Sequence, residues 1–304
     1  MATDFWNMVF GLVWRVVIGT WLLLGTAWAQ GPSVLIVTAH PDDETTFPVT
    51  IYKLTRDLGG AADLLLLTDG AGGFNGSELG AQYYGYKLYD SLIGRERLPA
   101  IRKQELFNAG RIMGIRNYFF ADQPDDAYSR NEKPYLSGGR WDMTLIDRKL
   151  DQTLARNRYD FVFVMLPDSG QHAHHKTATL AALRAINRLK TGPKPVVLAG
   201  KELDRNRRFT FTQLAGYPET RISSGTYAFA FDRAARWGHE NKLSYPIVAD
   251  WVTNEYKSQG DLQNNGIHTG ELETFWCFDS NGPAGLAKAR QLFDALQASG
   301  VPGK

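Results

Sequence analysis

The feature that most constrains the fold is a regular alternation between short apolar runs and helix-like segments. The first run, residues 33–39, reads SVLIVTA and carries no charged residue. Continuous runs of β-branched and apolar residues are typical of strands buried on both faces of a sheet. Comparable runs follow at residues 62–70, 116–122, 160–167 and 194–200. The sequence therefore predicts five central strands.

Segments with helical patterns separate these runs, at residues 43–59, 95–115, 143–157 and 174–190. In the second of them, a long amphipathic helix is expected to begin near Pro99, because apolar residues recur there at helical spacing. Strands that alternate with helices pair in parallel and are covered from both sides. The rhythm predicts an α/β, Rossmann-like fold with a mostly parallel sheet and helices on both faces.

The chain beyond residue 200 is less regular. Residues 208–214 and 226–232 are strand-like, and an apolar stripe near residues 283–298 predicts a terminal helix. These features predict a C-terminal extension that contains β-structure. Because no repeat, low-complexity tract or linker interrupts the sequence, we expect residues 30–304 to form a single domain.

Residues 1–29 have the pattern of a secretory signal peptide. Arg15 precedes a short apolar run, and Ala27-Trp28-Ala29 supplies the small residues of a cleavage site. An uncleaved membrane anchor is the alternative, because the first residues are also partly apolar and Asp4 is atypical of a signal. We expect cleavage, export to a bacterial periplasm or the extracellular medium, and no stable membrane insertion of the mature chain.

Net charge and cysteine content limit which partners and which cellular compartment are expected for this protein. The formal net charge is +2, which gives no indication of a nucleic-acid partner. Cys277 is the only cysteine, so no intrachain disulfide can form. An exported protein without disulfides points to a bacterial envelope or a secreted bacterial product.

Ionisable residues gather just past the ends of the predicted strands, where ligands bind in open parallel sheets. The first strand is followed by His40, Asp42, Asp43 and Glu44 in the sequence AHPDDE. The third strand is followed by Asp122, and the fourth by His172, His174 and His175 in the sequence HAHH. Four of the six histidines of the chain therefore lie in two loops at one predicted edge of the sheet.

This grouping predicts a metal site. Zinc binds imidazole nitrogen and carboxylate oxygen in tetrahedral sites, and a catalytic zinc site keeps one position for water. His40 and Asp43 can face one point, and a histidine of the fourth-strand loop would complete the set. Asp42 lies between them and is placed to act as a general base. The alternative is that His40 and Asp43 only cap the next helix and that the histidine loop is solvated.

AHPDDE at residues 39–44 is followed far downstream by an H-x-x-H at residues 172–175. Together they resemble the signature of the PIG-L/LmbE-like family of zinc-dependent de-N-acetylases. RKQELFNAGRIMG at residues 102–114 resembles a helix of that family, with Met113 in a leucine position. KSQ (257–259) and ETF (273–275) are also similar to family features, so the resemblance covers roughly residues 33–280.

The resemblance implies a PIG-L-like deacetylase domain that removes the N-acetyl group from an N-acetylglucosamine-type sugar or glycoconjugate. It implies one Zn²⁺ per chain, held by His40, Asp43 and His175. It also implies that Asp42 is the general base, that His172 stabilises an oxyanion or acts as an acid, and that Arg102 contacts the substrate.

One position departs from the family pattern. The second family motif usually reads H-P-D-H, whereas this chain has histidine, alanine, histidine and histidine at residues 172–175. His174 thus replaces an acidic residue and stands beside the implied third ligand. Whether His174 competes with His175 for the metal stays open.

Two further regions are candidates for substrate contacts. Tyr83 and Tyr84 lie in an aromatic segment, GAQYYGYKLYD (80–90), and their rings could stack on a sugar. The alternative for them is a surface loop packed on itself. Asp122, Asp125 and Asp126 lie past the third strand, where they could bind a polar group of the substrate or could simply form a turn.

Two other functions stay open. One is a non-catalytic carbohydrate-binding protein with a degenerate metal site, which His174 would favour. The other is a metal-dependent amidase or esterase with a non-sugar substrate. The sequence specifies neither the sugar, nor the metal present in vivo, nor the oligomeric state.

Overall fold

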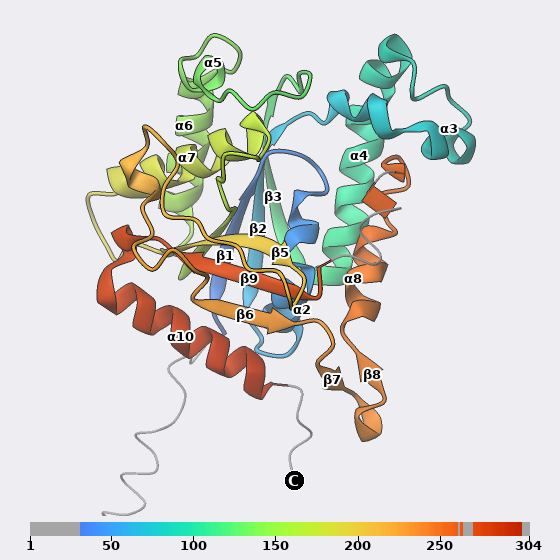
Figure 1. Ribbon diagram of the computed structural model, residues 1–304. Helices are drawn as coiled ribbons and strands as arrows, with labels where there is room; N and C mark the ends of the chain where they lie inside the picture. Colours follow the sequence, from blue (N-terminus) through green and yellow to red (C-terminus); the bar gives the residue numbers. More distant parts are fainter. Residues whose placement is uncertain (1–30, 261, 264–269, 300–304) are drawn as a thin grey trace, which may run out of the picture. The chain divides into compact units, whose positions relative to one another are not determined.

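A seven-stranded sheet forms the centre of the computed structural model (Figure 1). Its strands lie in the order β3-β2-β1-β4-β5-β9-β6, and the first five of these pair in parallel. The strands are β1 (Ser33–Thr38), β2 (Ala61–Thr68), β3 (Ile115–Gln123), β4 (Phe161–Met165), β5 (Val196–Leu203), β6 (Phe229–Asp232) and β9 (Leu272–Cys277). The predicted α/β class with a mostly parallel sheet is confirmed.

The structure describes residues 31–260, 262–263 and 270–299. The described residues from Pro32 onward form one compact unit. The predicted signal peptide, residues 1–29, lies outside the described residues. Within the described part, none of the helices combines the length and the apolar character that crossing a membrane requires.

Helices connect the parallel strands and cover the sheet. They are α2 (Pro48–Arg56), α3 (Glu78–Tyr84), α4 (Ser91–Met113), α5 (Lys133–Leu136), α6 (Met143–Arg156), α7 (Ala173–Arg188), α8 (Pro246–Thr253) and α10 (Gly282–Ala298). Short 3-10 helices follow β1 at Asp43–Thr46 and β2 at Ala71–Gly76. A small hairpin of β7 (Arg236–Trp237) and β8 (Leu243–Ser244) lies apart from the main sheet.

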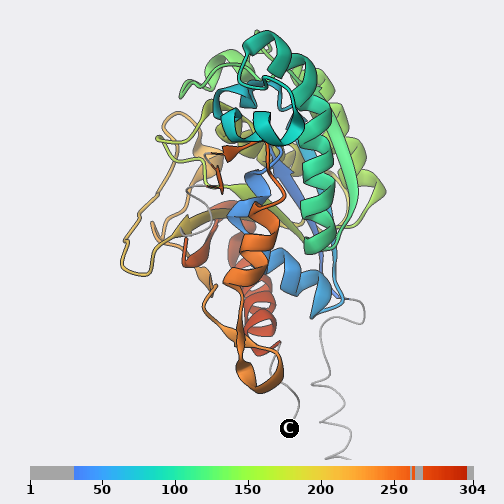
Figure 2. The same ribbon diagram turned by 90° about the vertical axis from the view of Figure 1, so that its right-hand side faces the viewer.

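The two faces of the sheet bury different side chains, because successive residues of a strand point to opposite sides. On one face, Val162 and Val164 of β4 pack in the core that includes residues of α6 and α7. On the other face, Phe163 contacts Phe47 and Phe275, and Phe275 contacts Phe293 of α10. The helix α8 packs along α4 at one side of the sheet (Figure 2).

Helix α4 begins earlier than the sequence predicts. The expected start near Pro99 is wrong, because α4 begins at Ser91 and contains Pro99 in its interior. Asp90 caps the helix, and its carboxylate accepts hydrogen bonds from the backbone of Leu92 and Ile93. This cap satisfies two of the backbone donors at the helix start, and the helix continues through the proline.

The strands observed in the C-terminal extension are not all the ones that the sequence predicts. Residues 208–214 form no strand; Phe211 and Thr212 instead make single backbone hydrogen bonds to Gly225 and Ile222. β9, which the sequence analysis does not predict, inserts between β5 and β6. A glutamate interrupts its apolar pattern: the buried Glu273 accepts hydrogen bonds from the first backbone N–H groups of α2.

Candidate metal and catalytic site

The site is built on the loop that leaves β1. The carbonyl of Ala39 accepts hydrogen bonds from the backbone N–H and hydroxyl of Thr68, at 2.9 and 2.7 Å, which fixes where this loop leaves the sheet. Asp43 then folds back on the loop. Its Oδ2 accepts hydrogen bonds from the backbone N–H groups of Ala39 and His40, at 2.9 and 2.8 Å. With Oδ2 engaged, Oδ1 faces the histidines that follow β4.

Three donor atoms from these two loops form a tight triangle. His40 Nδ1 lies 3.0 Å from His175 Nε2, His175 Nε2 lies 3.1 Å from Asp43 Oδ1, and His40 Nδ1 lies 3.5 Å from Asp43 Oδ1. Tetrahedral zinc with bonds of about 2.0–2.1 Å has ligand atoms about 3.3 Å apart. The predicted set of His40, Asp43 and His175 therefore has the separations that one metal ion requires.

Gln171 supports the metal-binding tautomer of His175. Its Oε1 lies 2.9 Å from His175 Nδ1. Because an amide oxygen can only accept, the proton of the imidazole sits on Nδ1 and the lone pair of Nε2 stays free for a metal.

The charges around the triangle also suit a cation. Burial by itself lowers the pKa of His40, but the carboxylates of Asp125 and Asp43 outweigh it and raise that pKa to about 10. Burial raises the pKa of Asp43, yet the neighbouring His175 and His40 hold it well below its usual range. The two carboxylates thus stabilise a positive charge at His40. A divalent cation at this place would neutralise the negative charge of the carboxylates in the same way.

Asp42 has a strained backbone. Its φ is 125°, in a region that side chains with a Cβ rarely adopt. Its carbonyl accepts hydrogen bonds from the backbone N–H and hydroxyl of Thr45, at 2.9 and 2.7 Å, and its N–H donates to Glu44 Oε2 at 3.2 Å. Strain of this kind costs about 1–3 kcal/mol and clusters at functional sites.

The environment of Asp42 suits a proton acceptor. Burial raises the pKa of its carboxyl to about 6; Arg102 opposes the shift, and Asp43 adds to it. Arg102 Nη2 donates a hydrogen bond to Asp42 Oδ2 at 2.9 Å. A carboxylate with a pKa near 6 is a stronger base than an ordinary aspartate and is still ionised at neutral pH.

Arg102, expected to contact substrate, lies beneath Asp42 and is only 3% exposed. Besides Asp42, its guanidinium donates to the carbonyls of Pro41 and Gly70, at 2.7 and 2.9 Å. A Cβ at Gly73 would lie 2.7 Å from Arg102 Nη1, so the glycine segment after β2 wraps closely around this side chain. The contacts of Arg102 in the structure are those of a residue that positions Asp42.

His172 caps helix α7. Its Nδ1 accepts a hydrogen bond from the backbone N–H of His174 at 3.1 Å, so a neutral His172 carries its proton on Nε2. Burial and, after it, the nearby imidazoles of His174, His40 and His175 together lower the pKa of His172 to about 3. The structure therefore favours a neutral imidazole that donates a hydrogen bond, rather than an imidazolium.

His174 is completely buried and lies beyond the other ring nitrogen of His40. Its Nδ1 is 2.9 Å from His40 Nε2, while its Nε2 has no hydrogen-bond partner among the described residues. The rings of Tyr135 and Trp141 pack against it at centroid distances of 4.6 and 4.7 Å. His174 therefore does not stand in the triangle of His175.

Asp125 is a member of the site that the sequence analysis names only as one of three aspartates past the third strand, without predicting its contact with the histidines. Its Oδ1 lies 3.4 Å from His40 Nε2 and 3.5 Å from His174 Nδ1. Its Oδ2 accepts a hydrogen bond from the backbone N–H of Gly72 at 2.9 Å. The only signal for it is the aspartate-rich loop after β3, and the sequence does not indicate which of its aspartates faces the histidines.

The other predicted substrate residues lie apart from the metal-binding donors. Asp122 is exposed and forms an ion pair with Lys103 at 2.5 Å. Tyr84 donates a hydrogen bond to Glu105 at 2.7 Å, and the ring of the exposed Tyr83 packs edge-on against Tyr84. No described contact joins these three candidates to His40, Asp43 or His175.

Two of the family-like motifs, residues 102–114 and the KSQ segment, contact each other in the structure. Glu105 of α4 accepts hydrogen bonds from the backbone and hydroxyl of Ser258, at 2.7 and 2.6 Å, and so ties the KSQ segment to α4. The hydroxyl of Tyr256 donates to Glu44, and burial raises the pKa of Glu44 to about 8. Because Glu44 also accepts a hydrogen bond from the backbone N–H of Asp42, the contact with Tyr256 supports the loop that carries Asp42.

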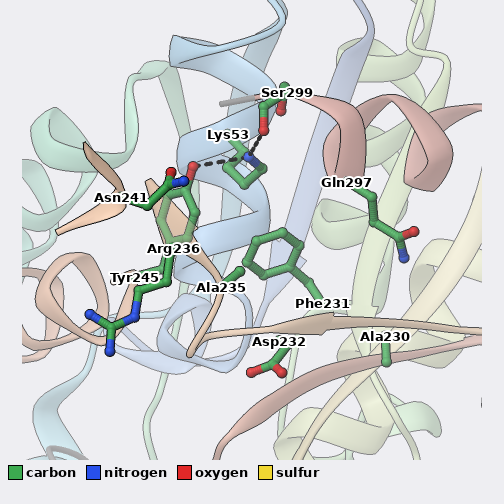
Figure 3. A pocket seen from close by; sticks show the side chains of 10 residues that line it. All are labelled: Lys53, Ala230, Phe231, Asp232, Ala235, Arg236, Asn241, Tyr245, Gln297 and Ser299. Atoms are coloured by element: carbon green, nitrogen blue, oxygen red, sulfur yellow. Dashed lines mark hydrogen bonds between the residues drawn. The ribbon is translucent and has the colours of Figure 1, made fainter. Parts of the chain in front are cut away.

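A separate cavity of about 340 Å³ opens beside α2, β6 and the hairpin of β7 and β8 (Figure 3). Its charged centre is Lys53, which donates hydrogen bonds to Tyr245, Asp57 and the carbonyl of Ser299, at 2.9, 3.2 and 2.8 Å. All three donors of the ammonium group are therefore occupied. None of the residues that line this cavity is a candidate metal ligand, base or substrate contact.

The candidate site residues from His40 to His175 lie within the part of the chain that a known family matches. The family PIG-L: GlcNAc-PI de-N-acetylase matches residues 35–186, half of the chain. Two similar proteins, from Bacillus cereus and Bacillus subtilis, are each described as a probable N-acetyl-alpha-D-glucosaminyl L-malate deacetylase 2. Each is 25% identical, over 55% and 57% of this chain. The matches span 66% and 69%, about two thirds, of the length of those relatives.

Solved structures share the fold. The pseudoaglycone deacetylase Dbv21 is similar with a TM-score of 0.52 and 15% identity, over 82% of this chain and 97% of that one. A deacetylase of the teicoplanin biosynthesis pathway is similar with a TM-score of 0.50 and 14% identity, over 80% of this chain and 96% of that one. At these identities the likeness establishes the common fold.

Proposed function

The chain belongs to the PIG-L family of GlcNAc-PI de-N-acetylases, and on that premise we propose that it is a zinc-dependent hydrolase that removes the N-acetyl group from an N-acetylglucosamine-type sugar or glycoconjugate. The observation that carries the proposal is the triangle of His40, Asp43 and His175 beside the carboxylate of Asp42. The deacetylases similar to this chain support the reaction type. The substrate is proposed from those relatives and from the family.

The proposed zinc ligands are His40 Nδ1, Asp43 Oδ1 and His175 Nε2. Two nitrogens and one carboxylate oxygen at 3.0–3.5 Å from one another are donors that zinc accepts. When bound there, zinc would activate water and polarise the amide carbonyl of the substrate. The oriented Nδ1–H of His175 and the anchored Oδ2 of Asp43 keep these donors in place before any ion arrives.

Asp42 is the proposed general base. Arg102 holds Oδ2, which leaves Oδ1 to take a proton from the attacking water. The strained backbone of Asp42 directs the carboxylate toward the site rather than along the next helix. After water attacks, the same carboxyl group returns the proton to the departing amine, so that the products are acetate and a free amino sugar.

His172 is the proposed hydrogen-bond donor to the oxygen of the amide as negative charge develops on it. The Nε2–H of a neutral imidazole is sufficient for this role, and Nδ1 is already an acceptor in the cap of α7. Arg102 is assigned to positioning Asp42. Tyr83, Tyr84 and Asp122 remain proposals for contacts with outer parts of a glycan.

The export of the protein is also a proposal, since it rests on the pattern of residues 1–29 alone. An exported deacetylase would meet cell-envelope or extracellular polysaccharide. A fluorescent or enzymatic fusion to residues 1–29 in a bacterium would report export, and retention of the fusion in the cytoplasm would contradict it.

The decisive experiment measures acetate release from a panel of N-acetylglucosamine-containing glycans, with and without a metal chelator. We expect release from at least one glycan, loss of release with the chelator, and recovery when Zn²⁺ is restored. Release from non-sugar amides or esters only would favour the metal-dependent amidase or esterase. Glycan binding without bound zinc and without acetate release would favour a carbohydrate-binding protein.

A further inference from the structure

Both ring nitrogens of His40 face another imidazole. Nδ1 lies 3.0 Å from His175 Nε2, and Nε2 lies 2.9 Å from His174 Nδ1. Two imidazole nitrogens at such a distance repel each other unless a proton or a cation lies between them. The proposed zinc accounts for the first contact. The second contact holds either the proton of His40 Nε2 or a second cation.

The second contact is part of another triangle. His40 Nε2, His174 Nδ1 and Asp125 Oδ1 are separated by 2.9, 3.4 and 3.5 Å. The first triangle has separations of 3.0, 3.1 and 3.5 Å. The two sets thus have the same donor types and nearly the same dimensions, and His40 belongs to both.

The added donors are held in place independently of any ion. His174 is completely buried between the rings of Tyr135 and Trp141. Asp125 is 4% exposed, and the N–H of Gly72 fixes its other oxygen. A buried imidazole and a buried carboxylate that converge on one nitrogen are unlike a solvated surface cluster.

We propose that this chain binds a second divalent transition-metal ion, of which zinc is the type, at His40 Nε2, His174 Nδ1 and Asp125 Oδ1, with His40 bridging the two ions. The inference rests on the proposed function for the first ion. Two nitrogens and one carboxylate oxygen suit zinc-like cations better than Ca²⁺ or Mg²⁺, which prefer oxygen. When the second ion binds, the proton on His40 Nε2 leaves to solvent.

The second site is weaker than the first. Arg102 Nη1 lies 3.7 Å from Asp125 Oδ2, so its positive charge opposes a cation on the other oxygen of the same carboxylate. The first triangle has no such neighbour on Asp43, whose Oδ2 accepts only backbone N–H groups among the described contacts. The ions therefore bind in sequence, and the second requires excess metal.

Occupancy of the second site has a consequence for catalysis. His172 forms a possible metal group with His40 and His174, with donor atoms within 4.8 Å of one another. Since Nδ1 of His172 caps α7, Nε2 is the nitrogen that is available to this ion. The same Nε2 is the proposed donor to the substrate, so a second ion lowers turnover.

Metal counting on the full chain tests the proposal. The protein is freed of metal with a chelator and dialysed against increasing Zn²⁺, and bound zinc is measured by mass spectrometry of the metal. We expect two zinc ions per chain at saturation in the wild type and one in His174→Asn, since the amide can accept the proton of His40 but is a poor ligand. His239→Asn is the matched control, because His239 is 88% exposed, and it should still bind two.

Two further variants assign each bound zinc ion to one of the two sites. His175→Asn should lose the first ion and retain the second, so it should bind one. Asp125→Asn should lose the second ion and bind one, and it serves in place of His174→Asn if that variant does not fold. With Co²⁺ in place of Zn²⁺, the visible absorption should grow over two equivalents in the wild type and over one in His174→Asn.

The proposal is overturned if the wild type saturates at one zinc, or if His174→Asn and Asp125→Asn each bind as many ions as the wild type. Either result places a shared proton, not a cation, between His40 and His174. Acetate release is recorded at one and at two equivalents of zinc in parallel. Two bound ions at saturation in a protein that releases no acetate at one equivalent would refute the proposed function alone; release by a protein that saturates at one ion would refute the second site alone.

Discussion

Two buried polar clusters lie in this molecule, and they differ in how their hydrogen bonds are satisfied. Around Lys53, three donors meet three acceptors, of which Figure 3 shows Tyr245 and Ser299. Tyr245 also donates to Asp57 at 3.3 Å. Around His40, imidazole nitrogens face each other at 2.9 and 3.0 Å, and Asp42 has a strained φ of 125°. The first cluster is complete as it stands, whereas the second requires added protons or cations.

The difference separates a structural role from a functional one. A buried polar network that satisfies all its members rigidifies a fold, whereas local conflicts tend to mark sites of binding and catalysis. Lys53 ties α2 to Tyr245 and to Ser299 near the end of the described chain. The His40 cluster instead brings together three loops whose side chains do not satisfy one another. The predictions below test this contrast.

The largest effect is expected from Asp42→Asn. The substitution removes the proposed base and leaves all three proposed zinc ligands, so kcat/KM should fall about 10²–10⁴-fold while zinc is retained. Acetate release and zinc content measured on the same preparation check this. Full activity in a variant that still holds zinc would show that another group accepts the proton.

In contrast to Asp42→Asn, Lys53→Met should lower stability and leave activity unchanged. It leaves Asp57, Tyr245 and the Ser299 carbonyl without their donor, so the free energy of unfolding should fall by about 1–3 kcal/mol. The activity of the folded protein should be unchanged, because no proposed site residue contacts Lys53. Urea unfolding and acetate release below the transition provide the measurement.

Lys242→Met is the matched control for that prediction. Lys242 has a side chain that is 68% exposed, so its loss should change stability by less than about 0.5 kcal/mol. A loss of activity in Lys53→Met without a loss of stability would remove the distinction between the two clusters.

Arg102→Gln should move the pH profile. Burial raises the pKa of Asp42 to about 6, and Arg102 lowers it. Since the base must be ionised, kcat/KM falls as pH drops through this pKa; without the arginine the pKa is higher, and the acid limb should move to higher pH. A bound cation lowers the pKa in both proteins and leaves the direction of the difference intact.

The pH–rate profiles of the wild type, Arg102→Gln and Arg102→Lys check this prediction. Arg102→Lys retains the positive charge and should show the smaller shift. An acid limb that stays in place, or moves to lower pH, in Arg102→Gln would contradict the assignment of Asp42 and Arg102 as a pair.

The smallest effect concerns the strain at Asp42. Asp42→Gly and Asp42→Asn both lose the carboxylate, but only glycine adopts a φ of 125° without a steric cost. We expect Asp42→Gly to be more stable than Asp42→Asn by about 1 kcal/mol in urea unfolding. Equal stability would show that the backbone of this loop is relaxed and does not store strain.

Much of the parallel half of the molecule follows from the sequence, because each element there carries its own local pattern. Residues 33–39 are apolar throughout, as a doubly covered strand requires, and β1 is buried along nearly its whole length. β9 has no such pattern, because Glu273 interrupts it and finds its partners in the first turn of α2 and in Arg233. A strand whose buried charge is satisfied by an arginine and a helix start distant in the sequence is not visible in local periodicity.

The same division holds within the site. The sequence alone determined the chemistry of the β1 loop, because His40, Asp42 and Asp43 are contiguous and their backbone holds them together. Only the tertiary structure decided that His175 completes the first triangle and that Asp125, not Asp122, meets His40 and His174. Those choices depend on ångström-scale distances between loops on different strands. Such distances are fixed by how the sheet and helices pack, and no local pattern encodes them.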